Sequence, residues 1–447
     1  MISFPFFNQL NTSYNRKFIT KNRLQQETKP LRSHNISEIS NNSLAKNDFP
    51  YRSSSSTYKN TLKTRESPIS DPRRLTTFSF ERQYHLSSSE KFPISKNLMN
   101  FPMSQKTLLQ HFPEYLTEYE KEEVKAYNLI HFFGNNCLNK PKTLQEFDDD
   151  HGHYIAKQGD HIVYRYEIFN ALGKGTFGNT FKCFDHKQKN FCAVKIIRNK
   201  KRLQVQSEKE VKILKRIKDL NIDKKFGVVQ ILDHFRFRKH CCIVFELLDM
   251  SLLQHLKLNN RRSFPIEVCK SLTKCLLHSL DFLSSAHIIH CDIKPANLVF
   301  SSDLNIPLKL IDFGTSCFHG DLNSTYIQSR YYRAPEVIMK LSLTQAIDMW
   351  SLGCVIYELV TGIILFQGKT ENEVLRLIVK YRGKPPQEMI LNSNKANFPW
   401  GEKQAEFDFA DKGLVNLLES NFYSGCLDWN PRSRLTPTEG LSHSWFK

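Results

Sequence analysis

The sequence lacks the features that define several common protein classes. Its eleven cysteines are odd in number and contain no Cys-x-x-Cys pair, so we expect buried thiols in a reducing compartment and no disulfide framework. The longest apolar stretch, Trp350–Phe366, is interrupted by Glu358 and is too short to span a bilayer, so we expect no membrane association. No internal repeat is visible. We therefore expect a cytoplasmic protein, with the nucleus left open as a second location.

The positive charge is concentrated in one part of the chain. Residues 1–100 hold 16 Lys/Arg and 7 Asp/Glu and so contribute +9 of the formal net charge of +18. They are rich in Ser and Asn and show no sustained periodicity, so they cannot bury enough surface to offset the entropy lost on ordering. We predict a disordered basic arm over 1–100. The high charge raises nucleic-acid binding as a further class of function, but no stacking platform, zinc spacing or recognition helix accompanies it, so we do not expect nucleic acid as a partner.

Beyond residue 100 the apolar residues recur with the periods of folded structure. Residues 107–138 have a mixed helical pattern. Five short β-type runs follow: Tyr166–Leu172, Thr180–Asp185, Phe191–Ile197, Val228–Phe237 and Cys241–Glu246. One helical run, Val205–Leu220, lies between the third and the fourth of them. From residue 248 onward helical patterns dominate, as in Pro265–His287. These patterns predict an α+β fold of two lobes, a small antiparallel sheet with one helix over 166–246 and a larger, mainly helical lobe over 250–446.

A pair of motifs in the second lobe carries the chemistry. His-Cys-Asp-Ile-Lys-Pro-Ala-Asn occupies 290–297, and Asp-Phe-Gly begins twenty residues after Asp292. This spacing supplies one carboxylate to orient a hydroxyl, and an amide and a second carboxylate to hold magnesium. We predict that Asp292 is the base or hydroxyl-orienting residue, that Lys294 neutralises the moving phosphoryl group, and that Asn297 and Asp312 ligate Mg²⁺. None of the four is replaced, which argues against a catalytically idle scaffold with the same fold.

The first lobe carries a glycine-rich loop, Gly173-x-Gly175-x-x-Gly178. Dinucleotide-binding folds share this pattern, but there the loop runs into a helix, whereas here residues 181–184 read as a strand. Glycines let backbone amides approach the phosphates of ATP without a Cβ in the way. Lys195 of Ala-Val-Lys would bind the α and β phosphates. We expect it to pair with Glu210, fifteen residues later, in preference to Glu208.

Further motifs identify a family resemblance. The segments DFGTSC at 312–317, YIQSRYYRAPE at 326–336 and AIDMWSLGC at 346–354 resemble the dual-specificity tyrosine-regulated kinases, the DYRK family of the CMGC group. Residues 147–168 resemble the box that precedes the kinase domain in that family. The helical segment and NKKRL at 199–203 resemble its class 2 branch, whose accessory region assists maturation. The resemblance covers about residues 107–446. It implies an accessory region at 101–147, a DYRK-type box at 148–165 and a kinase domain at 166–446.

The resemblance implies a dual-specificity protein kinase that uses ATP and Mg²⁺. It would phosphorylate Ser and Thr of protein substrates and, once, its own Tyr326, whose phosphate Arg330 and Arg333 would clamp. Phe245 resembles the gatekeeper beside adenine. The full ATP site would comprise Leu172, Gly173, Gly175, Gly178, Thr180, Ala193, Lys195, Glu210, Phe245, Glu246 and Leu248. Glu336 would pair with Arg434, and Asp348 would brace the segment around Asp292. We expect a monomer.

Some positions depart from the family pattern. Cys291 in place of arginine is shared by the family, whereas Thr180 stands where kinases place Val over adenine. Ser324 stands where the family has the first tyrosine of a Tyr-x-Tyr pair, which brings the chain closer to the homeodomain-interacting kinases, the alternative family. Ala296 and Ile363 replace acids that favour arginine before the phosphoacceptor. We therefore predict weakened arginine selection, with preference for a following proline retained through Arg330.

Overall fold

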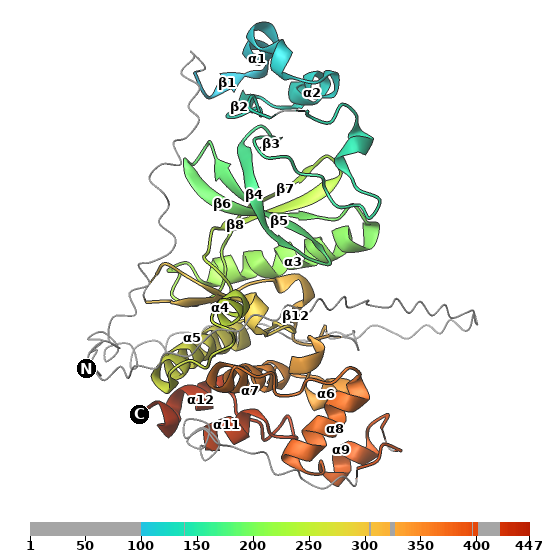
Figure 1. The fold of residues 1–447 in the computed structure, drawn as a ribbon, viewed down its shortest axis with the longest axis vertical. Coiled ribbons are helices and arrows are strands. Elements are labelled where there is room, and N and C mark those ends of the chain that lie inside the picture. Colours follow the sequence, from blue (N-terminus) through green and yellow to red (C-terminus); the bar gives the residue numbers. More distant parts are fainter. Residues whose placement is uncertain (1–99, 138, 304, 322–326, 396, 401–420) are drawn as a thin grey trace, which may run out of the picture. The chain divides into compact units, whose positions relative to one another are not determined.

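The computed structural model describes residues 100–137, 139–303, 305–321, 327–395, 397–400 and 421–447 (Figure 1). Residues 1–99 of the predicted disordered arm lie outside the described residues. Tyr326 also lies outside them. The description below concerns the described residues alone.

The smaller lobe is built on a six-stranded sheet whose neighbouring strands all run antiparallel, in the order β3-β4-β5-β6-β8-β7. The strands are β3 His161–Ile162, β4 Tyr166–Lys174, β5 Gly178–Asp185, β6 Asn190–Ile197, β7 Ile231–Phe237 and β8 His240–Glu246. The run predicted from Val228 begins three residues later as a strand of this sheet. Val228 and Val229 instead meet Leu310 of the larger lobe, where the N–H of Val229 donates to the Leu310 carbonyl at 3.0 Å.

One long helix, α3 Lys201–Leu220, lies between the sheet and the larger lobe (Figure 1). Its buried residues recur three or four positions apart and include Glu210, Ile213, Leu214 and Ile217, as expected for a helix with one face on a core. The helix begins four residues before the predicted start at Val205, because its first turn holds a single apolar residue, Leu203, which sets up no apolar periodicity.

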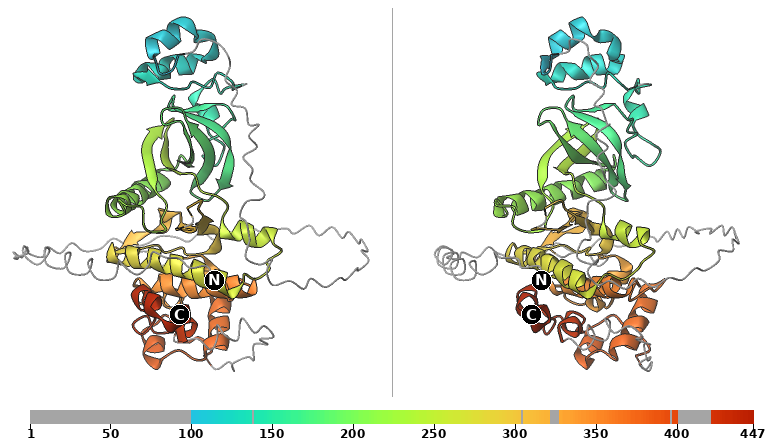
Figure 2. Two further views of the ribbon diagram at one scale, coloured as in Figure 1. Left: turned by 90° about the vertical axis from the view of Figure 1, so that its left-hand side faces the viewer. Right: turned by 60° about the vertical axis from the view of Figure 1, so that its left-hand side comes forward.

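The region that precedes the sheet folds into short elements at the end of the smaller lobe farthest from the larger lobe (Figure 2). These are β1 Met103–Ser104, α1 Gln105–His111, η2 Pro113–Tyr115, α2 Glu118–Glu123, η3 Val124–Ala126, β2 Leu129–Ile130 and η4 Leu144–Phe147. The helical pattern predicted here is interrupted because Pro113 cannot continue α1. A second helix starts anew at Thr117, whose side chain accepts from the N–H of Glu120 at 3.2 Å while the Glu120 carboxylate accepts from the N–H of Thr117 at 3.0 Å.

The larger lobe is mainly helical. Its elements are α4 Leu252–Leu258, α5 Ile266–Ser285, β9 Ile288–Ile289, η5 Pro295–Asn297, β10 Leu298–Phe300, β11 Leu308–Leu310, η6 Phe313–Thr315, β12 Cys317–Phe318, η7 Arg330–Tyr332, α6 Pro335–Ile338, α7 Ala346–Thr361, α8 Glu371–Arg382, α9 Gln387–Leu391, α11 Asn421–Cys426, α12 Pro437–Ser442 and η8 Ser444–Phe446. Helix α7 is buried along almost its whole length and forms the centre of the core. It ends at Thr361 with Gly362 as its C-cap, and the apolar stretch that ends at Phe366 is therefore only partly helical.

The predicted α+β fold of two lobes is confirmed. All eleven cysteines lie among the described residues and are free thiols. In the part of the chain that the structure describes, no helix has both the length and the apolar character needed to cross a bilayer.

Candidate active site

The site is assembled first around Lys195 on β6. Its Nζ lies 2.7 Å from the carboxylate of Glu210 on α3 and 2.9 Å from that of Asp312, so the two lobes meet at this ammonium group. Glu210 is therefore the partner of Lys195, as predicted. Glu208, the alternative, lies on the exposed face of α3 and pairs with Arg236.

The charges of this triad are mutually dependent. Burial by itself would lower the pKa of Lys195, but the carboxylates of Asp312 and Glu210 raise it above its ordinary value. Burial would raise the pKa of Asp312, but the ammonium of Lys195 holds it below its ordinary value. For Glu210 burial prevails, and its pKa is raised despite Lys195. Lys195 and Asp312 therefore remain charged at neutral pH, which is the state that phosphate and metal binding require.

Asp348, near the start of α7, forms hydrogen bonds with the segment that carries Asp292. The two Asp348 carboxylate oxygens accept from the backbone N–H groups of His290 at 2.7 Å and Cys291 at 3.0 Å. Cys291 has a positive φ of 66°, a conformation unusual for a residue with a side chain, and these two hydrogen bonds stabilise it. The bracing role predicted for Asp348 is confirmed.

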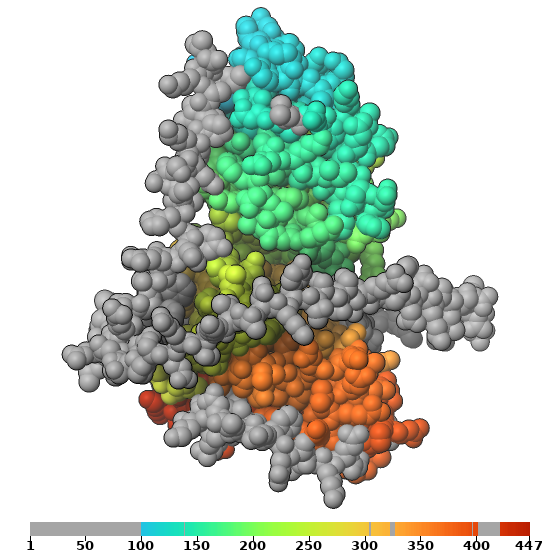
Figure 3. Space-filling view, viewed as in Figure 1, coloured from blue at the N-terminus to red at the C-terminus, as the bar shows by residue number. Residues whose placement is uncertain are grey.

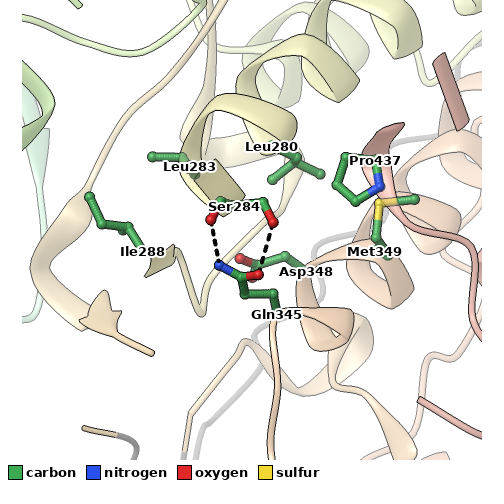
Figure 4. Close-up of a pocket in the computed structure, with 8 residues that line it drawn as sticks. All are labelled: Leu280, Leu283, Ser284, Ile288, Gln345, Asp348, Met349 and Pro437. Carbon is green, nitrogen blue, oxygen red and sulfur yellow. Dashed lines mark hydrogen bonds between the residues drawn. The ribbon is translucent and has the colours of Figure 1, made fainter. Parts of the chain in front are cut away.

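Burial raises the pKa of Asp348 to about 7, and the hydrogen bonds from His290 and Cys291 act against that rise. Beside this carboxyl lies a small cavity of about 10 Å³, lined by Leu280, Leu283, Ser284, Ile288, Gln345, Asp348, Met349 and Pro437 (Figure 4). Such a volume holds about one water molecule. Ser284 and Gln345 donate to each other across its rim, so the cavity is part of the support beneath the site and is too small for a substrate.

Asp292 and Lys294 point toward a common position. Lys294 Nζ lies 2.7 Å from Asp292 Oδ2, and the hydroxyl of Ser329 donates to Asp292 Oδ1 at 2.7 Å while accepting from Lys294 at 2.9 Å. A hydroxyl group is thus already seated between the carboxylate and the ammonium. Sequence reasoning missed Ser329, although it lies three residues after Tyr326 within the motif that was recognised.

The oxygen atoms near Asp292 and Asp312 suit a hard cation. Asn297 donates its side-chain N–H groups to Asp292, at 2.9 Å to the backbone carbonyl and 3.1 Å to Oδ2, so its Oδ1 is the atom that can ligate a metal. The backbone carbonyl of Asn297 accepts from the N–H of Ile311, which places Asn297 beside Asp312. One amide oxygen and one ionised carboxylate match the ligands that Mg²⁺ takes in proteins.

The expected nucleotide side of the cleft is formed by the β4–β5 hairpin and β8. The hairpin closes through the N–H of Gly175, which donates to the Gly178 carbonyl at 2.9 Å. Gly178 packs against β6 so closely that a Cβ would lie 2.1 Å from the carbonyl oxygen of Ile196, so glycine is needed there for strand packing. Phe245 is buried opposite Ala193 on the neighbouring strand.

The remaining residues of the predicted nucleotide site line the same hairpin and the link between the lobes. Both carboxylate oxygens of Glu246, at the end of β8, accept hydrogen bonds from the ammonium of Lys309 in the larger lobe, each at 2.8 Å. Leu248 lies two residues after Glu246 and is partly buried against the core. Leu172 and Thr180 lie on the hairpin, where Leu172 is exposed and Thr180 is half-buried.

A second cluster of potential metal ligands lies at the accessory region. Glu120, Asp160 and His161 are buried, and their ligand atoms lie within 4.8 Å of one another. The guanidinium of Arg238 reaches into this cluster, 3.3 Å from Glu120 and 3.9 Å from Asp160. Lys140 also lies 3.2 Å from Glu120, so two cations already offset the two carboxylates. The cluster is therefore an ion-pair network that joins the accessory region to the β7–β8 hairpin.

The segment after Tyr326 is anchored by its arginines. Arg333 is buried, donates to the backbone carbonyl of Gln328 at 2.6 Å, and pairs with Glu371 at 2.5 Å. Arg330 donates to the Lys369 carbonyl at 2.5 Å. The phosphate clamp predicted for these two arginines stays a prediction, because Tyr326 lies outside the described residues.

Two further pairs complete the support of the site. Arg434 and Glu336 form a fully buried bidentate pair at 2.6 and 2.9 Å, which confirms the predicted pairing. Sequence reasoning missed Gln328, whose side chain donates to Ile347 and Ser351 and accepts from the N–H of Ala334. Its φ of 62° could not be predicted from the sequence, because a positive φ is expected mainly at glycine and asparagine.

Comparison with known proteins agrees with this geometry. Residues 166–446 match the model of the protein kinase domain. The chain is 39% identical over 354 residues to the DYRK-family kinase pom1 of Schizosaccharomyces pombe, covering 74% of this chain and 33% of that protein. It is 40% identical over 355 residues to the serine/threonine-protein kinase ppk5 of the same organism, covering 74% and 42%.

A third relative is matched over most of its own length. The chain is 39% identical over 360 residues to the human dual specificity tyrosine-phosphorylation-regulated kinase 4, which covers 76% of this chain and 69% of that protein. By contrast, the chain spans a third to under half of the length of the two fission-yeast relatives.

Proposed function

Because the chain belongs to the protein kinases, and among them to the dual-specificity tyrosine-phosphorylation-regulated kinases, we propose that it transfers the terminal phosphoryl group of ATP to serine and threonine hydroxyls of protein substrates. One observation carries this proposal. Lys195, Glu210 and Asp312 meet at distances of 2.7 and 2.9 Å, beside the segment that holds Asp292 and Asn297. A charged triad between two lobes is the arrangement that phosphoryl transfer requires.

Each residue of the site has a role that follows from its contacts. Lys195, held by Glu210, binds phosphate oxygens. Asp292 orients the acceptor hydroxyl and takes its proton. The seating of the Ser329 hydroxyl on Asp292 Oδ1 at 2.7 Å supports this role, because it demonstrates that a hydroxyl fits there. Lys294 offsets negative charge on the group in transfer.

The cofactors of the proposed reaction are ATP and Mg²⁺. Asn297 and Asp312 would hold the metal, whose bound charge would stabilise the charge that develops on the phosphate oxygens. The residues around Phe245, Glu246 and Leu248 would receive the adenine. These side chains would promote phosphoryl transfer through their fixed positions and charges. Replacing one of them should therefore reduce the rate with little change in the fold.

The finer features of the activity are also proposals. The enzyme phosphorylates its own Tyr326 and prefers a proline after the acceptor. Ala296 and Ile363, neither of which carries charge, weaken the selection for arginine before the acceptor relative to the family pattern. Ile363 is 61% exposed, so its side chain is available to a bound peptide. The protein acts as a monomer in the cytoplasm.

The test is phosphoryl transfer by the full chain. Purified protein would be incubated with Mg²⁺ and radiolabelled ATP and a proline-directed peptide library, and its own phosphosites mapped by mass spectrometry. We expect label in Ser/Thr peptides and in Tyr326, and no label with Asp312→Asn. Folding of that variant would be checked by thermal unfolding. A well-folded wild-type protein that transfers no phosphoryl group would overturn the proposal.

A further inference from the structure

A buried glutamate at the end of α7 is already paired with an arginine of this chain. Glu358 is fully buried, and its Oε1 lies 2.9 Å from Arg261 Nη1, while its Oε2 accepts from the hydroxyl of Tyr332 at 2.5 Å. The Arg261 side chain is 38% exposed. A partly exposed guanidinium thus covers a buried carboxylate, and both carboxylate oxygens already have a partner in this chain.

The pair lies next to the site where the acceptor hydroxyl is oriented. Tyr332 follows Ser329 by three residues, and Ser329 donates to Asp292. On the other side, Arg261 follows α4, and α4 packs against η5, which carries Ala296. Arg261 and Glu358 therefore flank the surface that runs from Asp292 past Ala296.

The backbone of Arg261 is fixed at this place. Its φ is 54°, and its N–H donates to the Leu256 carbonyl at 2.6 Å. Gly362 lies so close that a Cβ there would be 1.8 Å from the Arg261 carbonyl oxygen, and Gly362 itself has a φ of +74°. Both Arg261 and Gly362 have left-handed backbone conformations and pack against each other. The Arg261 backbone therefore cannot shift without disrupting the end of α7. The fold consequently fixes the backbone from which the Arg261 side chain reaches Glu358.

Two residues of this surface, Ile363 and Ala296, are uncharged. Ile363, which directly follows Gly362, is 61% exposed, and Ala296 is half-buried. An arginine of a substrate that reached this surface would find Glu358 covered and would approach a like charge. An apolar substrate residue would instead cover the exposed side chain of Ile363.

We propose that Arg261 is an internal counterion that closes Glu358 to basic substrates, and that the surface formed with Ile363 and Ala296 selects an uncharged, apolar residue two or three positions before the phosphoacceptor. The inference rests on the proposed kinase function. It adds a specificity-determining residue, Arg261, whose removal should create an arginine preference that the wild-type enzyme does not have.

The experiment compares two peptides that differ only in carrying Arg or Leu at those positions, each with Ser followed by Pro. Wild type, Arg261→Gln and the matched control Arg262→Gln, an exposed neighbour, would be assayed for kcat/KM with both peptides. We expect Arg261→Gln to raise the Arg-to-Leu ratio of kcat/KM about ten-fold, the effect of one charge pair worth about 1.4 kcal/mol. Arg262→Gln should leave the ratio unchanged.

A second measurement needs no variant, in case uncovering Glu358 disrupts folding. With the wild-type enzyme, the Arg peptide should be the poorer substrate at low salt, and the difference should shrink as salt screens the repulsion from Arg261. Equal ratios for wild type and Arg261→Gln, or a wild-type ratio that favours Arg at low salt or does not change with salt, would overturn this inference. Either result would leave the proposed function standing, since both require phosphorylated peptide, whereas failure to phosphorylate either peptide would contradict the function itself.

Discussion

Replacement of Arg238 by methionine should detach the accessory region from the smaller lobe. The Arg238 side chain is fully buried. Its Nε and Nη2 donate to Glu123 at 3.0 and 2.9 Å, Nη1 donates to the Tyr154 hydroxyl at 3.1 Å, and the guanidinium lies 3.8 Å from the centre of the Phe147 ring. These partners come from α2, η4 and the segment between η4 and β3, so one side chain of the β7–β8 turn contacts three parts of the region before the sheet. The atoms of that region, coloured blue to teal, lie directly against those of the sheet (Figure 3).

The backbone at this turn supports the importance of the side chain. Arg238 and Lys239 have φ values of 45° and 69°, conformations that a hairpin turn usually fills with Asn or Gly. Methionine keeps an unbranched, largely apolar side chain in place of the arginine stem and removes the charge, leaving Glu120 and Glu123 without this counterion. Loss of one partner of a buried ion pair destabilises by about 3–5 kcal/mol. Because Lys140 stays 3.2 Å from Glu120, we expect the lower end, about 3 kcal/mol.

Native-state hydrogen exchange measures this loss locally. A loss of about 3 kcal/mol corresponds to a roughly hundred-fold rise in the opening equilibrium constant, so amides in 103–164 should exchange about a hundred-fold faster. The matched control is Arg236→Met, two residues earlier, because its pair with Glu208 is exposed by 61% and 62% and such pairs contribute at most about 1 kcal/mol. Should Arg238→Met accelerate exchange no more than Arg236→Met, the buried guanidinium does not hold the accessory region in place.

Three further outcomes follow from the packing and charges of single residues. Gly178→Ala should lower the melting temperature by the equivalent of about 1–3 kcal/mol, because its Cβ would lie 2.1 Å from a backbone oxygen, whereas Gly173→Ala, with nothing within 4 Å, should not; equal melting temperatures would contradict this. Glu336→Gln should destabilise the larger lobe by about 3–5 kcal/mol in urea unfolding, since Arg434 is left buried without its countercharge, and a loss below about 1 kcal/mol would refute the reasoning. Burial would raise the pKa of Glu120, but the hydrogen bond and charge of His161 and the charge of Lys140 hold it at about 2, against an ordinary value of 4.5. The resulting stability is present above pH 4.5 and is lost as the pH falls toward 2, so exchange within 103–164 should accelerate over that range by the equivalent of about 3 kcal/mol, and a flat profile would rule out the network.

Local patterns in the sequence were enough for the architecture and for much of the site. Alternating and helical periods depend on which face of an element is buried, and they located β5, β6, α3 and α5 to within a few residues. The ion pair of Lys195 with Glu210 could be predicted, because a strand lysine fifteen residues before a helical glutamate is part of a recognised motif. The pair of Glu336 with Arg434 was accessible in the same way, through resemblance to a family.

Contacts without such a motif were decided by the tertiary structure. Arg261 and Glu358 are 97 residues apart, and Arg238 lies 115 residues from Glu123. Neither pair has a period or a spacing that marks it, because a buried ion pair depends on how separate elements pack and leaves no repeat along the chain. The chain alone therefore specifies two lobes and the residues of a phosphoryl-transfer site. Packing determines that Arg238 ties the accessory region to the sheet and that Arg261 covers Glu358, because only the folded backbone brings those charges within reach of one another.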